Sequence, residues 1–287
     1  MSTAQTLEVP GHQVVQFLGS GARSTIWQIR DRETGGLLAL KRVVKRGSRD
    51  GRFLEQALNE YEVSRHFDHP VVRRIHRARR IKRWLALREI QLFMEFCGGA
   101  TIQEDRPRSV GEILRIFVHV AEALAHINAK GFVHADMKPN NIIVSPDGRV
   151  KIIDLGQSCP LGTVKQRIQG TPDFIAPEQV RRLPLDARTD VFNFGAALYW
   201  TLTGRAIPTV LPKKSPAGIG KRETTLPPEQ LNDQVPPSLS KLVLDCVESS
   251  PPRRPKSMND VLARLNLIAH TLNRQEPPPQ DSPPCPT

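Results

Sequence analysis

The sequence predicts a mixed α+β protein of two lobes, in which the strands come first and the helices follow. Residues 1–96 contain short runs of Val, Ile and Leu broken by glycines and polar turns, as in a small sheet, and one segment of helical periodicity. In residues 97–274 the apolar side chains recur mainly at helical spacing. Residues 275–287 are rich in Pro, and this composition cannot bury enough apolar surface to fold. We therefore expect a β-rich N-lobe with one helix, a larger and mainly helical C-lobe, and a disordered tail.

The individual elements follow from the same two periodicities. Residues 53–66 carry apolar side chains near helical spacing, and this helix should end before Pro70, because a proline disfavours helical conformation in the residue before it. A long amphipathic helix should begin at Val110 and stop at Gly131. We expect strands over 14–18, 25–30, 37–44 and 86–96, and later helices over 190–203, 238–248 and 258–272.

Composition argues against several classes of protein. No apolar run approaches the roughly 18 to 20 residues that a membrane span needs. The N-terminus lacks the basic region followed by an apolar one that marks a secretory signal. The cysteines are scattered without the spacing of a zinc site or a disulfide framework, at Cys97, Cys159, Cys246 and Cys285. We therefore expect no membrane span and a reducing, cytoplasmic location.

Positive charge is concentrated in the N-lobe. The net charge is +12, and residues 1–95 contain 18 Lys and Arg against 10 Asp and Glu. The densest run consists of Arg73, Arg74, Arg77, Arg79, Arg80, Lys82, Arg83 and Arg88. Such a patch can bind an acidic protein, a nucleic acid or a membrane surface, and a solvated strand-and-loop face is the alternative. Only Trp84 interleaves with these residues, so the stacking platform of single-strand binders is missing and an acidic protein is the candidate partner.

The most informative segment is the run 134–141, which reads H-A-D-M-K-P-N-N. Asp136 and Asn141 lie five residues apart, and on one tight loop they can face a single point. The Asp can then accept a hydroxyl proton while the Asn helps to hold a metal ion, and Lys138 between them can neutralise charge on a phosphoryl group. A polar surface turn is the alternative interpretation.

This run resembles the catalytic loop of protein kinases, H-R-D-x-K-x-x-N, with Ala135 in place of the Arg. A Lys two residues after the Asp and followed by Pro is the serine/threonine form of that loop. The resemblance implies that Asp136 is the catalytic base, that Lys138 contacts the transferred phosphoryl group and that Asn141 binds Mg²⁺. The loop is of the H-A-D, or non-RD, type.

A second metal ligand is implied by the same resemblance. The segment 150–156 is an apolar strand followed by Asp154 and Gly156. Asp154 lies thirteen residues after Asn141. It carries D-L-G where protein kinases usually carry D-F-G, and this departure keeps every ligand. We therefore expect Asp154 and Asn141 to be the two protein ligands of Mg²⁺.

A glycine-containing turn between the first two strands is the candidate phosphate loop. The glycines of Gly19-Ser20-Gly21 would let backbone N–H groups approach phosphate oxygens without interference from a Cβ atom. The family pattern G-x-G-x-x-G-x-V is incomplete here, because Ser24 replaces the third Gly and Ile26 replaces the Val. An ordinary hairpin is the alternative. The resemblance implies nucleotide contacts from Gly19, Ser20, Gly21 and Ile26.

Lys41 matches the lysine of the third kinase strand, which contacts the α- and β-phosphates of ATP. The family pairs this Lys with a helix Glu, and Glu60 has the matching spacing from Pro70. Glu62 lies about 200° further round the helix and cannot point the same way. One turn after Glu60, Ser64 stands where kinases usually place an apolar side chain, so looser packing of this helix is possible.

The segment 92–99 resembles the hinge between the two kinase lobes. Any strand leading into a glycine turn would look similar, but this one lies midway between Lys41 and Asp136. The resemblance implies that the backbone around Glu95 and Cys97 binds the adenine edge and that Met94 controls access behind it. The residues expected to sandwich the adenine ring are Ile26, Ala39 and Ile143.

The segment 170–178, G-T-P-D-F-I-A-P-E, matches the end of the kinase activation segment. The resemblance implies that Thr171 bonds near Asp136 and Lys138, and that Asp190 braces the catalytic loop. If Glu178 is buried it needs a cation, and Arg254 stands where the family supplies one.

The absent Arg at position 135 bears on regulation. In kinases with H-R-D, a phosphate on the activation segment pairs with that Arg and orders the segment. Ala135 has no charge to offer, so we expect activity without this phosphorylation. A phosphate on Ser158 or Thr163 would need another partner, such as Lys165 or Arg167.

Together the ordered motifs, from about residue 14 to 270, identify the chain as a eukaryotic-like, bacterial-type serine/threonine protein kinase catalytic domain. The implied fold is the bilobal α+β kinase fold, and the implied reaction is transfer of phosphate from ATP, with Mg²⁺, to Ser or Thr of protein substrates, including the enzyme itself. A pseudokinase or scaffold that binds partners through the basic N-lobe is the alternative. A nucleic-acid-binding module rests on the basic patch alone.

Overall fold

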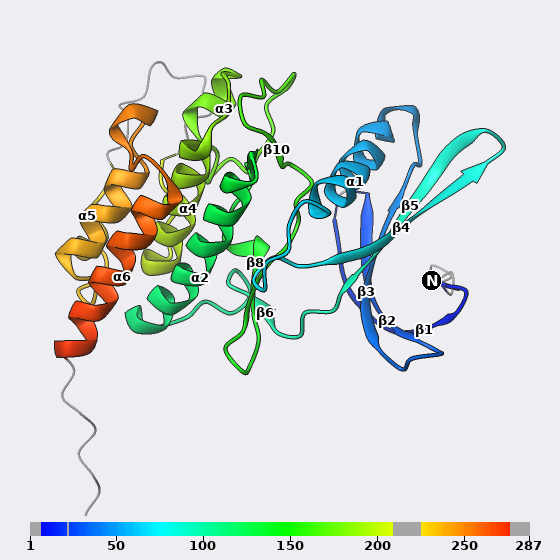
Figure 1. Cartoon of the computed structure of the whole chain (residues 1–287), viewed down its shortest axis with the longest axis horizontal. Coiled ribbons are helices and arrows are strands. Elements are labelled where there is room, and N and C mark those ends of the chain that lie inside the picture. The colour runs from blue at the N-terminus through cyan, green and yellow to red at the C-terminus, as the bar shows by residue number, and fades with distance from the viewer. Residues whose placement is uncertain (1–6, 22, 209–224, 276–287) are drawn as a thin grey trace, which may run out of the picture.

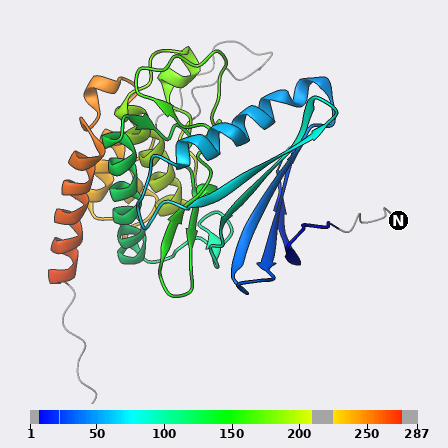
Figure 2. The same cartoon turned by 45° about the vertical axis from the view of Figure 1, so that its right-hand side comes forward.

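The computed structural model describes residues 7–21, 23–208 and 225–275. It has a sheet with one long helix beside it in the N-terminal part and a group of helices in the C-terminal part (Figure 1). The two parts stay distinct when the molecule is turned, and the long N-terminal helix runs along the sheet in both views (Figure 2). The prediction of an α+β fold with strands before helices is confirmed.

The N-lobe is built on one antiparallel sheet of five strands. These are β1 (His12–Ser20), β2 (Ser24–Asp31), β3 (Leu37–Val44), β4 (Ile75–Arg83) and β5 (Ala86–Glu95), in the spatial order β1-β2-β3-β5-β4. Strand β3 lies at the centre, which explains why Leu40 is fully buried while β1 at the edge keeps several side chains exposed. The central position of β3 holds Lys41 rigidly with respect to both neighbouring strands.

Strand β4 was not among the predicted strands. Its apolar residues, Ile75, Ala78 and Ile81, recur every three positions and not every two, and basic residues fill most of the gaps. Register shifts between Ile75 and Arg77 and between Ile81 and Lys82 explain this spacing, because each bulge moves the inward face by one residue. A strand with two irregularities loses the alternation by which strands are recognised in a sequence.

Helix α1 (Gly51–Ser64) covers one face of the sheet and starts two residues earlier than predicted. It follows a short 3-10 helix, η1 (Ser48–Asp50). Its buried residues Leu54, Ala57 and Val63 form an apolar face, and the first two pack into a cluster that includes Val43 of β3. Glu60 lies on the same buried side of the helix, so packing of the apolar face also delivers this carboxylate to the interior.

The C-lobe is mainly helical, as predicted. Its helices are α2 (Val110–Ala129), α3 (Pro177–Arg181), α4 (Ala187–Thr203), α5 (Pro237–Cys246) and α6 (Met258–Gln275), with short 3-10 helices η2 (Pro139–Asn141), η3 (Pro228–Gln230) and η4 (Pro251–Arg253). Short strands pair as β6 (Ala100–Thr101), β8 (Ile142–Val144) and β9 (Val150–Ile152), and as β7 (Phe132–Val133) with β10 (Cys159–Pro160). The expected tail begins within the last turn of α6, and residues 276–287 lie outside the described residues.

Two features of the C-lobe helices agree with the sequence. Ser109 caps α2 by accepting a hydrogen bond from the Glu112 amide, and Gly131 follows the helix with a φ of +85° that suits glycine. The rings of Phe117 in α2 and Phe194 in α4 meet edge to face at the centre of the lobe, 5.3 Å apart. This apolar core is the rigid base that carries the loops between the lobes.

The two lobes are joined by backbone pairing as well as by the chain itself. Val72 forms a parallel bridge with Ile152 of β9, supported by hydrogen bonds from the Arg73 amide to the Ile152 carbonyl and from the Ile152 amide to Val71. The segment before β4 is thereby attached to the strand that leads to Asp154.

The Glu178–Arg254 pair is the buried ionic contact that fixes the end of α3 to the rest of the C-lobe. The two guanidinium nitrogens donate to the two carboxylate oxygens at 2.7 and 2.9 Å, and Thr189 donates to the same carboxylate. Arg254 also donates to the carbonyls of Arg188 and Glu248, so each polar atom of the pair has a partner.

We predict that Arg254→Met destabilises the protein by about 3–5 kcal/mol, because Glu178 would be left charged and buried without a cation. Arg253→Met is the matched control, since Arg253 is the exposed neighbour in η4. Urea unfolding at neutral pH measures both. Equal free energies of unfolding for the two variants would contradict the assigned role of Arg254.

Candidate active site

A cavity of about 760 Å³ lies between the two lobes and gathers most of the predicted site residues. Its N-lobe side is formed by the β1–β2 turn, with Gly19, Ser20 and Gly21, and by Ile26, Ala39 and Lys41. Its C-lobe side includes Cys97, Lys138, Asn141, Ile143, Asp154 and Thr171. Of the predicted residues, Glu60, Met94, Glu95 and Asp136 do not line this cavity but lie beside residues that do.

The adenine end of the cavity offers few polar groups. Met94 is fully buried and pairs with Ala39 across β3 and β5, so its side chain forms part of the wall behind the cavity. The Glu95 amide is already bonded to the Arg74 carbonyl, and the Glu95 carbonyl accepts the weak Cys97 thiol at 3.7 Å. The Cys97 amide makes no hydrogen bond within the described residues. One acceptor and one donor are therefore left at the hinge for a planar heterocycle.

The phosphate end carries an ionic network. The Lys41 ammonium lies 2.6 Å from the Glu60 carboxylate and 3.6 Å from that of Asp154. Burial favours the neutral amine, but both carboxylates outweigh it and raise the pKa of Lys41, so this residue stays cationic. Burial raises the pKa of Glu60, and Lys41 is the main group that opposes this effect. The structure thus brings together the strand lysine and the helix glutamate that sequence spacing selected.

The catalytic loop places three side chains in mutual contact. Lys138 donates to the Asp136 carboxylate at 2.9 Å and to the Thr171 hydroxyl at 2.8 Å, and Thr171 in turn donates to Asp136 at 3.1 Å. Burial raises the pKa of Asp136, while Lys138 opposes the shift. A partly buried carboxylate beside a lysine can accept a proton from a hydroxyl that binds next to it.

The backbone of this loop has a strained conformation at Ala135, and the Asp190 carboxylate stabilises it. Ala135 has a φ of +62°, in the left-handed region that a residue with a Cβ atom adopts only at a cost of about 1–2 kcal/mol. The fully buried Asp190 carboxylate accepts the amides of His134 and Ala135, both at 2.9 Å, and the Asn128 side chain. Burial raises the pKa of Asp190 to about 6, although the hydrogen bonds from Ala135, His134 and Asn128 oppose this shift.

Asn141 and Asp154 are the candidate metal ligands. The amide nitrogen of Asn141 donates to the Asp136 carbonyl at 2.8 Å, which leaves its oxygen as the group for a cation. Burial disfavours the Asp154 carboxylate, but Lys41 and the Gly156 amide outweigh it and lower the pKa to about 2. No group of three His, Cys, Asp or Glu residues suited to a metal occurs within the described ranges. The two oxygens that Asn141 and Asp154 offer fit Mg²⁺, which uses one or two protein oxygens and takes further oxygens from phosphates and water.

Three residues that support this site were not found from the sequence, and neither were the cavity-lining residues Gln16, Leu18, Thr101 and Glu104. Asn59 donates to the carbonyls of Gly156 and Ser158, and so attaches α1 to the loop that carries Asp154. Gln179 donates to the Ala135 carbonyl at 2.8 Å. Both are neutral amides outside the matched motifs, and no sequence signal marked them. The third residue, Arg73, was assigned to the exposed basic patch, and this was wrong, because its side chain is buried and lines the cavity.

A prediction about the activation segment also needs correction. Ser158 was expected to be open to phosphorylation, but it is 1% exposed and its hydroxyl donates to the His134 carbonyl. Its position under the catalytic loop gives it a structural contact instead. Thr163 is more accessible and donates to the Pro160 carbonyl. Lys165, proposed as a phosphate partner, donates to the Gln157 carbonyl.

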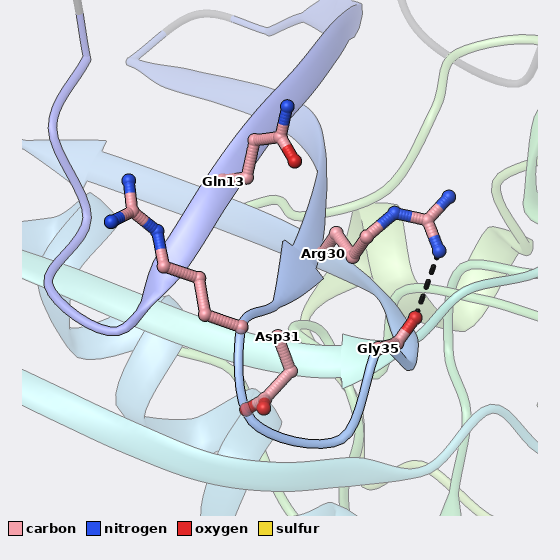
Figure 3. Close-up of a pocket in the computed structure, with 5 residues that line it drawn as sticks. Gln13, Arg30, Asp31 and Gly35 are labelled. Carbon is pink, nitrogen blue, oxygen red and sulfur yellow. Dashed lines mark hydrogen bonds between the residues drawn. The ribbon is translucent and has the colours of Figure 1, made fainter.

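A second hollow lies at the β2–β3 turn, far from these groups, and is lined by Gln13, Arg30, Asp31, Arg32 and Gly35. Figure 3 shows Arg30 reaching across the turn to the Gly35 carbonyl, to which it donates at 2.9 Å. Asp31 accepts the amides of Glu33 and Thr34. These side chains stabilise the turn itself, so the hollow is not a candidate site.

Comparisons with known proteins agree on one family. A family model described as the protein kinase domain matches residues 12–264. A probable serine/threonine-protein kinase of Clostridium acetobutylicum is 31% identical over 188 residues, which cover 62% of this chain and 28% of that protein. The serine/threonine-protein kinase PknB of Mycolicibacterium smegmatis is 27% identical, over 92% of this chain and 44% of that protein. PknA of Mycobacterium tuberculosis is 26% identical, over 95% of this chain and 64% of that protein.

The chain therefore spans less than two thirds of the length of these relatives. Among the helices of the described residues, none has the length and apolar character to cross a membrane.

His134 makes the stability of this site depend on pH. Burial lowers the pKa of His134 to about 4, and its Nδ1 accepts the Asp136 amide, which requires the neutral ring. The unfolded chain binds the proton near pH 6.5, so the stability contributed by the neutral ring is complete above that pH and is lost as pH falls toward 4.

We predict that lowering the pH from 7 to 5 costs the wild-type protein about 2 kcal/mol more than it costs His134→Asn. The difference isolates His134, because Asp190 titrates in both proteins. Urea unfolding at the two pH values measures it, with the exposed His119→Asn as a control that should behave as wild type. Parallel pH dependence in wild type and His134→Asn would contradict this assignment.

Proposed function

Because the chain belongs to the protein kinase family and its domain is a serine/threonine kinase catalytic domain, we propose that the protein transfers the γ-phosphoryl group of ATP to Ser or Thr hydroxyls of proteins, including its own. The observation that carries this proposal is that both ionic arrangements are formed at once around one cavity. Lys41 is paired with Glu60 on the N-lobe side, and Asp136, Lys138 and Thr171 are in contact on the C-lobe side.

Each group has a separate task in the proposed reaction. Lys41 binds the α- and β-phosphates, and the glycine turn with Gly19, Ser20 and Gly21 covers the triphosphate. Asp136 orients the acceptor hydroxyl and takes its proton, a role that contributes about 10²- to 10⁴-fold in rate. Lys138 neutralises charge on the phosphoryl group in transfer.

The remaining contacts concern the nucleotide and the metal. Asn141 and Asp154 would hold Mg²⁺, which when bound neutralises charge on the phosphate oxygens. Ile26, Ala39 and Ile143 would enclose the adenine ring. The Glu95 carbonyl and the Cys97 amide are the groups that the hinge leaves for its edge, with Met94 behind them.

A pseudokinase or scaffold is the second candidate function, and its support is a basic surface. We define the basic hairpin as Arg79, Arg80, Lys82, Arg83 and Arg88 on β4 and β5. Only Arg80 among these five has an acidic partner within 4.0 Å in the described chain, namely Glu62 at 3.7 Å. Such unpaired cations suit an acidic protein partner, which a working kinase and a scaffold can both use.

The scattered cysteines, of which the three described are free thiols, support a cytoplasmic location.

We predict Mg-ATP-dependent autophosphorylation on Ser or Thr. Asp136→Asn and Lys41→Ala should each lower its rate at least about 100-fold, because they remove the base and the phosphate contact. Transfer of labelled phosphate measures this, and Asp147→Asn, an exposed carboxylate, is the control. A wild-type rate for Asp136→Asn in folded protein would refute the assigned role and favour the scaffold.

We also predict that the unphosphorylated enzyme is active. Ala135 has no charge for a phosphate to pair with, and the neutral Gln179 side chain already connects its carbonyl to the segment after the activation loop. Phosphatase-treated protein, checked by mass spectrometry, should start turnover without a lag. A marked lag that disappears after incubation with Mg-ATP would show that another cation has replaced the missing Arg.

The basic hairpin is the basis of a further prediction. Replacement of Arg79, Arg80, Lys82 and Arg83 by Ser should weaken retention on heparin and on acidic polypeptides in a salt-dependent way, with ATP affinity unchanged. The matched control replaces four exposed cations of the C-lobe, which are Arg108, Arg115, Arg253 and Lys256. Equal elution of both variants would mean that net charge alone, and not the hairpin, binds polyanions.

A further inference from the structure

The site holds a second buried cation that the mechanism above does not use. Arg73 precedes β4, is 9% exposed and lines the cavity between the lobes. Its guanidinium lies 3.7 Å from one oxygen of Glu60, while Lys41 lies 2.6 Å from the other oxygen. Glu60 is 1% exposed, so its two oxygens face two different cations and almost no solvent.

The two cations reach Glu60 from different parts of the molecule. Lys41 belongs to β3 at the centre of the N-lobe sheet. The backbone of Arg73 is bonded instead to Ile152 of β9, two residues before Asp154. Glu60, and with it α1, is therefore held both to the sheet and to the strand that carries the metal loop.

The charges in this cluster also balance. Lys41 alone would face two carboxylates, those of Glu60 and Asp154. Because Arg73 adds a second positive charge, the cluster contains two cations and two anions, of which Asp154 is partly exposed. When Lys41 turns its donors toward phosphate oxygens, the contact of Glu60 with Arg73 does not depend on it.

Other contacts of α1 show why the pairing of Arg73 with Glu60 matters for the position of this helix. Ser64, at the end of the helix, donates its hydroxyl to the Tyr61 carbonyl and places no large apolar side chain against the metal loop. Within the described residues, the side-chain hydrogen bonds from α1 to that loop come from Asn59. Polar contacts at two successive residues, Asn59 and Glu60, thus add to the apolar packing of Val63, which lies in the same buried cluster as Leu155 of the metal loop.

We propose that Arg73 is a positioning residue that holds Glu60, and through it helix α1, toward the nucleotide site independently of Lys41. This inference refines the proposed kinase function, but its first test needs no activity. Arg73 acts through Glu60 and is not assigned a contact with the substrate.

The first test measures amide hydrogen exchange of α1 (Gly51–Ser64) without nucleotide. Lys41→Met should leave exchange in α1 within about twofold of wild type, because Arg73 still holds Glu60. Lys41→Met combined with Arg73→Met should increase it by at least about tenfold, since Glu60 then has no cation. If Lys41→Met alone accelerates exchange as much as the double variant, Arg73 holds nothing and the proposal is wrong.

The second test uses steady-state kinetics of phosphate transfer to a basic protein substrate. Arg73→Met should lower kcat about tenfold with little change in the KM for ATP, and Arg73→Lys should recover most of the loss. Arg74→Met is the matched control, because Arg74 is the exposed neighbour that pairs with Asp68. A raised KM with normal kcat would overturn the proposal in favour of direct nucleotide contact. Absence of all activity in the wild type would refute the kinase function and leave the exchange result to decide on Arg73.

Discussion

The geometry of the proposed active site depends on one buried carboxylate, that of Asp190. It accepts two successive backbone amides, from His134 and Ala135, and thereby fixes the loop just before Asp136. Those bonds, together with the one from Gln179 to the Ala135 carbonyl, offset the steric cost of the left-handed conformation of Ala135. Because α4 delivers Asp190 from the C-lobe core, the position of Asp136, the proposed base, is set by packing within that core.

Burying charge is expensive, and this domain does it repeatedly in balanced sets. Arg254 neutralises Glu178 at the end of α3, Lys138 neutralises Asp136 in the loop, and Lys41 with Arg73 neutralises Glu60 and Asp154. Only the first set lies away from the cavity and is fully enclosed. The other two border the cavity between the lobes, where ATP would bind under the proposed function.

The sequence was sufficient for the fold class and for most helices, because helical periodicity and a cap such as Ser109 are local signals. It failed at β4, where bulges break the alternation, and at Arg73, which looks like its exposed neighbours Arg74 and Arg77. Arg73 is buried because a backbone bridge to Ile152 turns its side chain inward, and such a bridge joins residues about eighty positions apart. Asn59 and Gln179 were also missed because their partners are distant in the sequence. These partners are backbone carbonyls, which no pattern of side chains reveals.

Ala135 and Ser64, two departures from the usual kinase sequence, can be interpreted in the same way. Ala135 lacks the cation that a phosphate on the activation segment would pair with, and Ser64 is a small polar residue where protein kinases usually have an apolar side chain. In each place the structure has a permanent polar contact instead: Gln179 bonds the Ala135 carbonyl, and Asn59 bonds the loop after Asp154 while Arg73 faces Glu60. The side chains of Gln179, Asn59 and Arg73 are not phosphorylated. Their contacts therefore do not require phosphorylation of the activation segment. Under the proposed function, we therefore expect control by access of the substrate and not by ordering of the site.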